Sequence, residues 1–479
     1  MITTQVSPKR KVASEKDGAG AARRFDWPVA YEAERFVRER IVRFCQANSL
    51  ASHLATRMRD ESGTDFFEWV DHAVLPLEEE QTLAKAGFIR NKALATPNGE
   101  LVYEHPQATL PRVLLRRGVS ESPAGVALRP EFIADFIAAQ QLAAEPEGEP
   151  WSRYRSVLVS EENGRRLEAV ERRAYRGFVP SALKPGELPA IVKARELWRT
   201  RQRLCESDAE GVAVANRLLR RVLNLVGRDL ACDLFFQAER AYWQRRNQAA
   251  QIQKARQDRL GLGWGNHDHH TFRCSREHFV ELNEFLLQLG FEKRERYYAG
   301  AEAGWGAQIS EQPIAGIVVF ADVDLMPEET QIDFSIQTLP PTTRLGTVGL
   351  WVGLHGESFL EAGMHHLEAR FDFNLLREQL KDSGINMMKP FSDFEFLRQA
   401  FTEGERWPVR PERMRKLLAG GLITQDRAAQ FTREGALGSH LENLQRHGGF
   451  KGFNQKSVSA VIAATDPRKD HFDSARAAV

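Results

Sequence analysis

The stretch from Gly261 to His447 contains the same succession of elements twice. In the first copy, NHDHHTFR predicts a strand, SREHFVELNEFLLQL a helix ended by a glycine, and GWGAQI and AGIVVFADVDL further strands. In the second copy, GMHHLEARF predicts a strand, NLLREQLKDSGI a helix and turn, and GSHLENLQRH a closing strand. The two histidine-bearing strands lie about 97 residues apart. This internal repeat predicts an α+β fold built on paired βαβββ modules.

A chain of 479 residues exceeds one ordinary hydrophobic core, so we expect several domains. The helical periodicity after Trp27 and the strand-helix unit FFEWVDHAVLPLEEEQTLAKAGF predict an α/β region, and AAEPEGEPWS predicts a linker. The following segment lacks strand alternation and is expected to be helical throughout. The predicted parts are a disordered basic tail (1–26), an α/β region (27–142), a mainly helical region (151–260), a metal-binding barrel (261–467) with a helical insertion (391–433), and a tail (468–479).

Charge and cysteine content limit the classes of partner and the cellular compartment that we expect. The 66 Lys and Arg residues nearly balance the 65 Asp and Glu residues, so the whole chain gives no reason to expect a polyanion. Residues 151–260 hold 23 basic against 13 acidic residues, but no binding motif accompanies this excess and we do not expect a nucleic-acid partner. The four cysteines form no CxxC pair, and no membrane-length apolar run is present. We therefore expect a cytoplasmic protein without a membrane partner.

Strand alternation sorts the polar residues of the repeat into faces. His267, His269, Thr271 and Arg273 fall on one face of NHDHHTFR, and His270 falls on the other. In HHLEARF, His366, Glu368 and Arg370 share a polar face, while His365 lies with the apolar residues. In SHLENLQRH, His440 and Glu442 lie on one side. His72, in VDHAVL, also begins a strand-helix unit but stands outside the repeat, so we interpret it as a structural residue.

Two imidazoles and one carboxylate from three strands make the facial triad that holds non-haem Fe(II) with coordination positions left open. The candidate imidazoles are His267 or His269 and His365 or His366, and Glu442 is the candidate carboxylate. Arg273 follows His269 by four residues on the same face, and its planar guanidinium suits a carboxylate. The pattern therefore favours a metal site for an acidic, chelating substrate.

The modules, with a histidine on each first strand and a glutamate on the last, resemble the vicinal oxygen chelate fold. More narrowly, HHTFR, HHLE and HLENLQRHGG resemble the motifs of the 2-oxoadipate dioxygenase/decarboxylase family, the hydroxyglutarate synthases. That resemblance covers roughly residues 261–467 and implies a vicinal oxygen chelate-like barrel that uses Fe(II) and O2 to convert a 2-oxo acid with loss of CO2. It implies His269, His366 and Glu442 as metal ligands and Arg273 as the carboxylate-binding residue, with His267 and His365 as the alternative ligands.

Several expectations complete this interpretation. Fe(II) is the expected metal, with Zn, Mn and Ni as alternatives, and the expected partners are a small 2-oxo acid and O2. Gln308 and Asn454 are candidates for a distal polar contact to the substrate, as is Lys451. One rival is a metal-dependent lyase or isomerase of the same fold, in which a glutamate moves a proton. Another is a non-enzymatic protein that binds a small ligand and contacts nucleic acid through its basic helical region.

Overall fold

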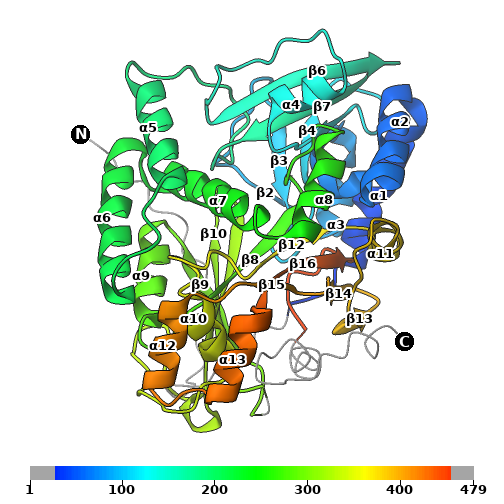
Figure 1. The fold of residues 1–479 in the computed structure, drawn as a ribbon. Coiled ribbons are helices and arrows are strands. Elements are labelled where there is room, and N and C mark those ends of the chain that lie inside the picture. The colour runs from blue at the N-terminus through cyan, green and yellow to red at the C-terminus, as the bar shows by residue number, and fades with distance from the viewer. Residues whose placement is uncertain (1–26, 302, 455–479) are drawn as a thin grey trace.

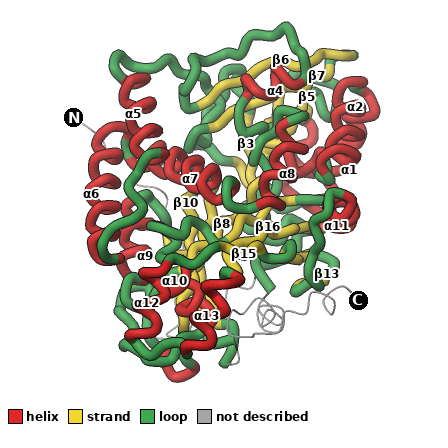
Figure 2. Tube along the Cα trace, viewed as in Figure 1, coloured by secondary structure: helices red, strands yellow, loops and turns green. Residues whose placement is uncertain are grey.

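The computed structural model describes residues 27–301 and 303–454, which form two β-sheets covered by helices (Figure 1). The predicted tails, 1–26 and 468–479, and residues 455–467 of the predicted barrel lie outside the described residues. In Figure 2 most strands of the two sheets lie among the helices, while β6 and β7 run along one edge of the molecule. Within the described part of the chain, no helix combines the length and the apolar character needed to cross a membrane.

The C-terminal sheet has nine strands and carries the repeat. Its order is β13-β14-β16-β12-β8-β11-β10-β9, with β15 paired to β16. The first module consists of β8 (His267–Arg273), α9 (Phe279–Gln288), β9 (Glu292–Tyr298), β10 (Trp305–Gln312) and β11 (Ile317–Asp324). The second consists of β12 (His366–Arg370), α11 (Phe373–Asp382), β13 (Ser392–Phe394), β14 (Leu397–Phe401) and β16 (Ala436–Arg446).

The two modules repeat each other in pairing as well as in order. In each module the first strand pairs in parallel with the last, β8 with β11 and β12 with β16. The modules join where β8 and β12 run antiparallel at the centre of the sheet. The α+β class and the paired, vicinal oxygen chelate-like modules expected from the sequence are therefore confirmed.

A β-bulge marks the central pair of strands. Glu368 of β12 lies opposite His269, but the next residue, Ala369, lies opposite His267. Asp268 is left without a partner across the ladder, and such an extra residue re-aims the side chains beside it. The bulge separates His267 from the face that His269 occupies.

The N-terminal sheet has seven strands in the order β2-β3-β4-β1-β5-β7-β6. Its strands are β1 (Val70–Pro76), β2 (Ile89–Arg90), β3 (Leu101–Glu104), β4 (Arg112–Arg116), β5 (Gly125–Leu128), β6 (Tyr154–Glu162) and β7 (Arg165–Arg172). With α3 (Glu80–Lys85) and α4 (Ile133–Ala139), they repeat the arrangement of the second sheet. Here too the central pair, β1 and β5, is antiparallel, and β1 and β5 pair in parallel with β4 and β7.

The first half of the chain corrects two expectations. Residues 154–172, expected to be helical, form the hairpin β6-β7 and join the N-terminal sheet across the predicted linker. The turn at Asn163-Gly164, with both residues at positive φ, is a hairpin signal that the helical interpretation overlooked. His72 does not stand outside a repeat, because it lies on the first strand of a βαβββ module.

Further helices lie outside the two sheets. Those at the start and before the second sheet are α1 (Tyr31–Ala47), α2 (Ser49–Arg57), α5 (Glu187–Arg199), α6 (Asp208–Val226), α7 (Arg228–Gln244) and α8 (Gln248–Asp258). Phe272, Leu367 and Leu441 point from the C-terminal sheet into a core shared with α5, α6, α7 and α9. The opposite face of these three strands carries the polar residues, so one face of the sheet is core and the other lines a cavity.

The predicted helical insertion, 391–433, is helical only in its second half. β13 and β14 belong to the second module, and β15 (Glu405–Trp407) pairs with β16. The helical expectation was wrong for these strands because pairing with β16 determines their conformation. Two helices follow, α12 (Pro411–Ala419) and α13 (Gln425–Glu434), and they pack against α10 (Thr347–His355), which joins the modules.

Glycines allow the two sheets to approach each other just before β8. A Cβ atom at Gly265 would lie 2.5 Å from the carbonyl oxygen of Arg129, and one at Gly261, whose φ is 70°, would lie 2.4 Å from the Cα of Phe136. Both contacts are with the segment that follows β5, and both are too close for any side chain. The start of β8 is therefore packed directly on the backbone of the N-terminal half.

Candidate metal centre

Four buried side chains meet on the polar face of the C-terminal sheet. The potential ligand atoms of His269, Glu368 and Glu442 lie within 4.8 Å of one another. His366 joins them, because its Nε2 is 2.5 Å from Glu368 Oε1 and 3.7 Å from Glu442 Oε2. All four residues are at most 7% exposed. The structure thus brings together His269, His366 and Glu442, as the sequence predicted, and adds Glu368, which was placed on the polar face but not named as a ligand.

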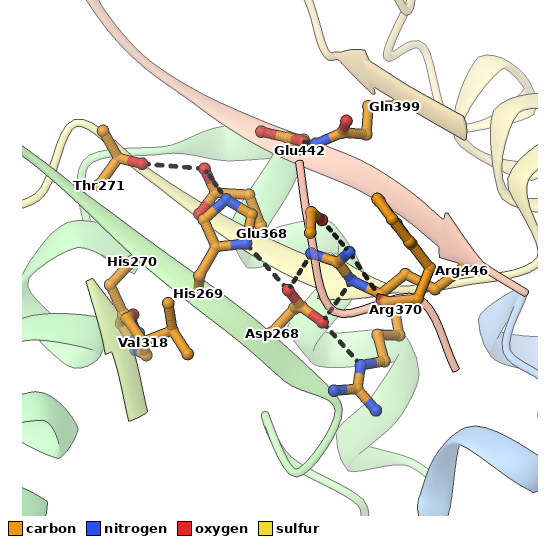
Figure 3. A network of polar contacts seen from close by, with 12 residues as sticks. Asp268, His269, His270, Thr271, Val318, Glu368, Arg370, Gln399, Glu442 and Arg446 are labelled. Carbon is orange, nitrogen blue, oxygen red and sulfur yellow. Dashed lines mark hydrogen bonds and ion pairs between the residues drawn. The ribbon is translucent and has the colours of Figure 1, made fainter. Parts of the chain in front are cut away.

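The ring of His269 is fixed from behind by Asp268. Its Nδ1 donates to Asp268 Oδ1 at 3.0 Å, and its Nε2 is directed toward the cluster, 3.2 Å from Glu368 Oε1 (Figure 3). Burial works against protonation of His269, but Glu368 and Asp268 outweigh it and raise its pKa. A carboxylate that holds the distal nitrogen of a ligating histidine sets its tautomer and orientation.

Asp268 is in turn held by two arginines of the second module. Arg370 Nε donates to Oδ2 at 2.8 Å, and Arg446 donates to both carboxylate oxygens at 3.0 and 3.1 Å. Burial alone would raise the pKa of Asp268, but Arg446 and Arg370 hold it well below its usual value. Asp268 is therefore an anion, and its bulged position lets it reach His269 and both arginines.

Neutral side chains orient the two glutamates. Thr271 Oγ1 donates to Glu368 Oε1 at 3.0 Å, and Gln399 Nε2 donates to Glu442 Oε1 at 2.8 Å. Burial and the neighbouring Glu368 raise the pKa of Glu442 well above its usual value. Two buried carboxylates this close repel each other unless a proton or a cation lies between them.

The donor set fits a divalent metal ion. Two imidazoles and two carboxylates supply nitrogen and oxygen ligands of the kind that Fe, Zn, Mn and Ni accept. Glu368 Oε2 and His366 Nδ1 are buried without a hydrogen-bond partner among the described residues, so this pocket contains polar atoms that its own side chains do not satisfy. A cation among these residues would also neutralise the excess of carboxylate charge. His269, His366 and Glu442 remain the predicted ligands, with Glu368 as an additional candidate.

The alternative histidines are engaged elsewhere. His267 Nδ1 lies 2.8 Å from the carbonyl oxygen of Trp264, and its ring packs on that of His270. The bulge at Asp268 explains why His267 does not share the face of His269, contrary to simple alternation. His365 borders the cavity, but its Nδ1 is 3.0 Å from the carbonyl oxygen of Gly438. The structure does not place either residue in the cluster.

The cavity beside the cluster has an arginine at one wall and aromatic rings at others. Arg273 lines it as predicted, with its guanidinium 5.6 Å from the centre of the Trp351 ring. Asp322 lies opposite Arg273 on β11, and burial raises its pKa to about 7, although Arg273 opposes this. The aromatic lining residues are Tyr297, Trp305, Phe320, Phe391, Phe401 and Phe453. The cavity thus offers a charged end and a largely apolar remainder.

The predicted distal contacts differ in their placement. Asn454 borders the cavity, and its amide donates to the carbonyl oxygen of Phe391 at 3.0 Å. Gln308 is buried in β10 and does not line the cavity; its amide donates to the carbonyl oxygens of Glu295 and Ile309. Lys451 pairs with Glu311 outside this cavity. Of these three residues, the structure brings only Asn454 to the candidate site.

The N-terminal sheet has a matching but incomplete arrangement. At the equivalent bulge, His72 Nδ1 donates to Asp71 at 2.8 Å, and Asp71 is held by Arg112 and Arg172. The residue opposite His72 is Ala127, in the place that Glu368 takes opposite His269. Phe178 packs edge-on against His72 within an apolar cluster. This sheet therefore keeps the aspartate-histidine pair and lacks the glutamate that faces it.

Comparisons with known proteins assign no family. No family model matches the sequence, and no curated protein matches it. Among solved structures, a triple mutant of 4-hydroxymandelate synthase from Streptomyces coelicolor is 14% identical and covers 84% of this chain and 99% of its own, with a TM-score of 0.28.

Two further structures match over shorter stretches. Methylmalonyl-CoA epimerase from Mycobacterium tuberculosis is 13% identical over 38% of this chain and 88% of its own, with a TM-score of 0.21. Glyoxalase I from Zea mays is 13% identical over 22% of this chain and 43% of its own, with a TM-score of 0.18. Similarity at these levels supports no conclusion about the reaction, and the fold assignment rests on strand order and pairing.

Proposed function

We propose that this chain is a metal-dependent enzyme, a non-haem Fe(II) dioxygenase/decarboxylase that acts on a 2-oxo acid. The observation that carries the proposal is the convergence of His269, His366 and Glu442 in one buried cavity that Arg273 also lines. Two histidines and a carboxylate are the ligand set of Fe(II) oxygenases. The expected substrate is a small 2-oxo acid of the 2-oxoadipate type, with O2 as the second reactant.

Fe(II) held by these residues would supply the redox chemistry that O2 activation requires. The protein residues orient the reactants. Arg273 binds the substrate carboxylate, and the Trp351 ring beside it limits the planes that its guanidinium can adopt. Asp268 keeps the Nδ1 proton on His269, so that Nε2 presents its lone pair to the cluster. Phe320 and Phe453, which pack against the His269 ring, exclude water from that side.

A lyase or isomerase is the second candidate, and Glu368 is the observation that favours it. If both histidines and both glutamates held the metal ion, four protein ligands would leave less room for a chelating substrate together with O2. A buried carboxylate beside the substrate could instead move a proton, as in glyoxalase-type chemistry. Dependence on O2 separates the two candidates.

The test measures the O2 consumed and the CO2 released by the iron-loaded protein. The protein purified without oxygen is loaded with Fe(II), and O2 uptake and CO2 release are measured with 2-oxo acids of increasing chain length. Equal amounts of O2 consumed and CO2 released support the dioxygenase/decarboxylase, whereas conversion without O2 supports the lyase or isomerase.

Variants connect the result to the site. His269→Ala and Glu442→Ala should lose bound iron, while His53→Ala, on the exposed face of α2, should keep it. Retention of stoichiometric iron by both site variants would show that the cluster holds no metal. Wild-type protein that binds no iron yet binds a 2-oxo acid would instead favour the non-enzymatic ligand-binding alternative.

A further inference from the structure

A second and much larger cavity lies between the two sheets. Its volume is about 1260 Å³, against about 80 Å³ for the cavity at the metal cluster. Residues from both halves of the chain line it, including Asp71 and Arg172 of the N-terminal sheet and Asp268 and Arg446 of the C-terminal sheet. The aspartates of the two bulges, Asp71 and Asp268, therefore both lie at the wall of this cavity.

The walls of this intersheet cavity carry an excess of positive charge. Eleven lysine and arginine residues line it, against seven aspartate and glutamate residues. Arg112 and Arg172 share the single carboxylate of Asp71, and Arg370 and Arg446 share that of Asp268. Each bulge thus presents two guanidinium groups for one aspartate.

Carboxylates pair with part of this excess, since Arg176 contacts Glu104, Lys451 contacts Glu311 and Arg294 contacts Glu295. Glu68 is 3.9 Å from Arg370, but burial raises the pKa of Glu68 to about 7, so it is only partly ionised at neutral pH. Arg129, at the end of β5, forms no ion pair or side-chain hydrogen bond with the described residues. Arg129 is half-buried, and this burial lowers the pKa of its guanidinium group. Cations withdrawn from water in this way are stabilised by a bound anion.

We propose that the intersheet cavity binds a small molecule carrying a phosphate or pyrophosphate group, with Arg129 as a direct contact. Phosphoryl groups carry more than one negative charge and accept hydrogen bonds from several guanidinium groups at once. Arginines from both sheets border the same space, which suits a polyphosphate better than a single carboxylate. This site is distinct from the metal cluster and does not depend on the reaction proposed there.

Isothermal titration of the full-length chain with inorganic pyrophosphate, in buffer free of divalent cations, tests the proposal. Wild-type protein should bind one pyrophosphate, and Arg129→Gln should weaken binding at least tenfold, because a charge-assisted contact is lost. Arg220→Gln, an exposed arginine of α6 outside the cavity, is the matched control and should bind like wild type. Arg273→Gln should also bind normally, since Arg273 lines the other cavity.

Several results would overturn the proposal. These are no binding to wild type at millimolar pyrophosphate, unchanged binding to Arg129→Gln, or loss of binding in Arg273→Gln, which would place the anion at the metal cluster. Citrate provides the carboxylate comparison, and binding as tight as that of pyrophosphate would refute the phosphate assignment. If Arg129→Gln does not fold, Lys293→Gln at the exposed wall of the cavity takes its place and should weaken binding at least threefold. Unchanged binding there would equally refute the site.

Discussion

Replacing Asp268 with asparagine tests two roles of this side chain. It orients the candidate ligand His269, and it stabilises a buried cluster of charged groups. The side chain of Asp268 is 8% exposed and accepts hydrogen bonds from Arg370, Arg446 and His269. Asparagine has the same shape but no charge, and either orientation of its amide places an NH2 group against one of these donors. Breaking a buried ion pair by removing one partner costs about 3–5 kcal/mol. We expect a loss of that size in the free energy of unfolding of Asp268→Asn, measured in denaturant.

The same substitution should weaken metal binding. Loss of a carboxylate that orients a ligating histidine lowers metal affinity about 10- to 100-fold. Competition titration with a chelator measures this, and the variant must first be shown to be folded at the assay temperature. The expected result is weaker iron binding in addition to lower stability.

Asp71→Asn is the matched control. Asp71 also sits at a bulge, also accepts from a histidine and two arginines, and lies in the sheet that has no glutamate opposite that histidine. We expect it to lower stability by a similar amount and to leave iron affinity unchanged. Equal iron affinity in Asp268→Asn and Asp71→Asn would refute the argument that Asp268 supports a ligand, and full stability of both would refute the buried-charge argument.

Three further predictions address other parts of the molecule. Arg273→Gln should raise the KM for the 2-oxo acid about tenfold or more, as steady-state kinetics with the preferred acid would show. Burial raises the pKa of Glu68 to about 7, so the folded protein holds this proton more tightly than the unfolded chain does. The resulting contribution to the free energy of unfolding is fully present below about pH 4 and is lost as the pH rises through 7. Glu68→Gln should therefore stabilise the protein by up to about 3 kcal/mol at pH 8 and not at pH 4, in paired denaturation curves; an equal effect at both values would contradict this. Phe178→Ala should cost about 3–5 kcal/mol of stability, because the ring is 3% exposed, without changing iron content; a loss of iron would show that the two sheets are coupled.

Periodicity predicted the C-terminal modules well because their strands bury one face and line a cavity with the other. Alternation alone placed His269 and Arg273 on one face of their strand, and His366 and Glu442 on the polar faces of theirs. Alternation wrongly placed His267 on the face of His269, because the bulge that separates them depends on how β8 pairs with β12, about a hundred residues away in the sequence. Glu368 was visible beside His366, but its approach to the other ligands depends on side-chain geometry across three strands.

The N-terminal half was harder to predict because its second module is short and its sheet is interrupted by loops. The hairpin β6-β7 carries many charged residues on its half-exposed faces, and this composition obscured its alternation. β13 and β14 are three and five residues long, and pairing with β16 rather than local preference explains them. Asp268 and Gln399 act through contacts with other candidate residues, and no local motif marks such a role.

The close approach at Gly261 and Gly265 has a consequence for the position of the strand that carries His269. The segment after β5 leaves no room for a side chain where β8 begins, so the observed position of β8 depends on this contact with the N-terminal half. A fragment beginning at residue 261 would lack the surface against which its first strand is aligned. We therefore expect the first 260 residues to help set the position of His269, and the two halves of the chain to unfold together.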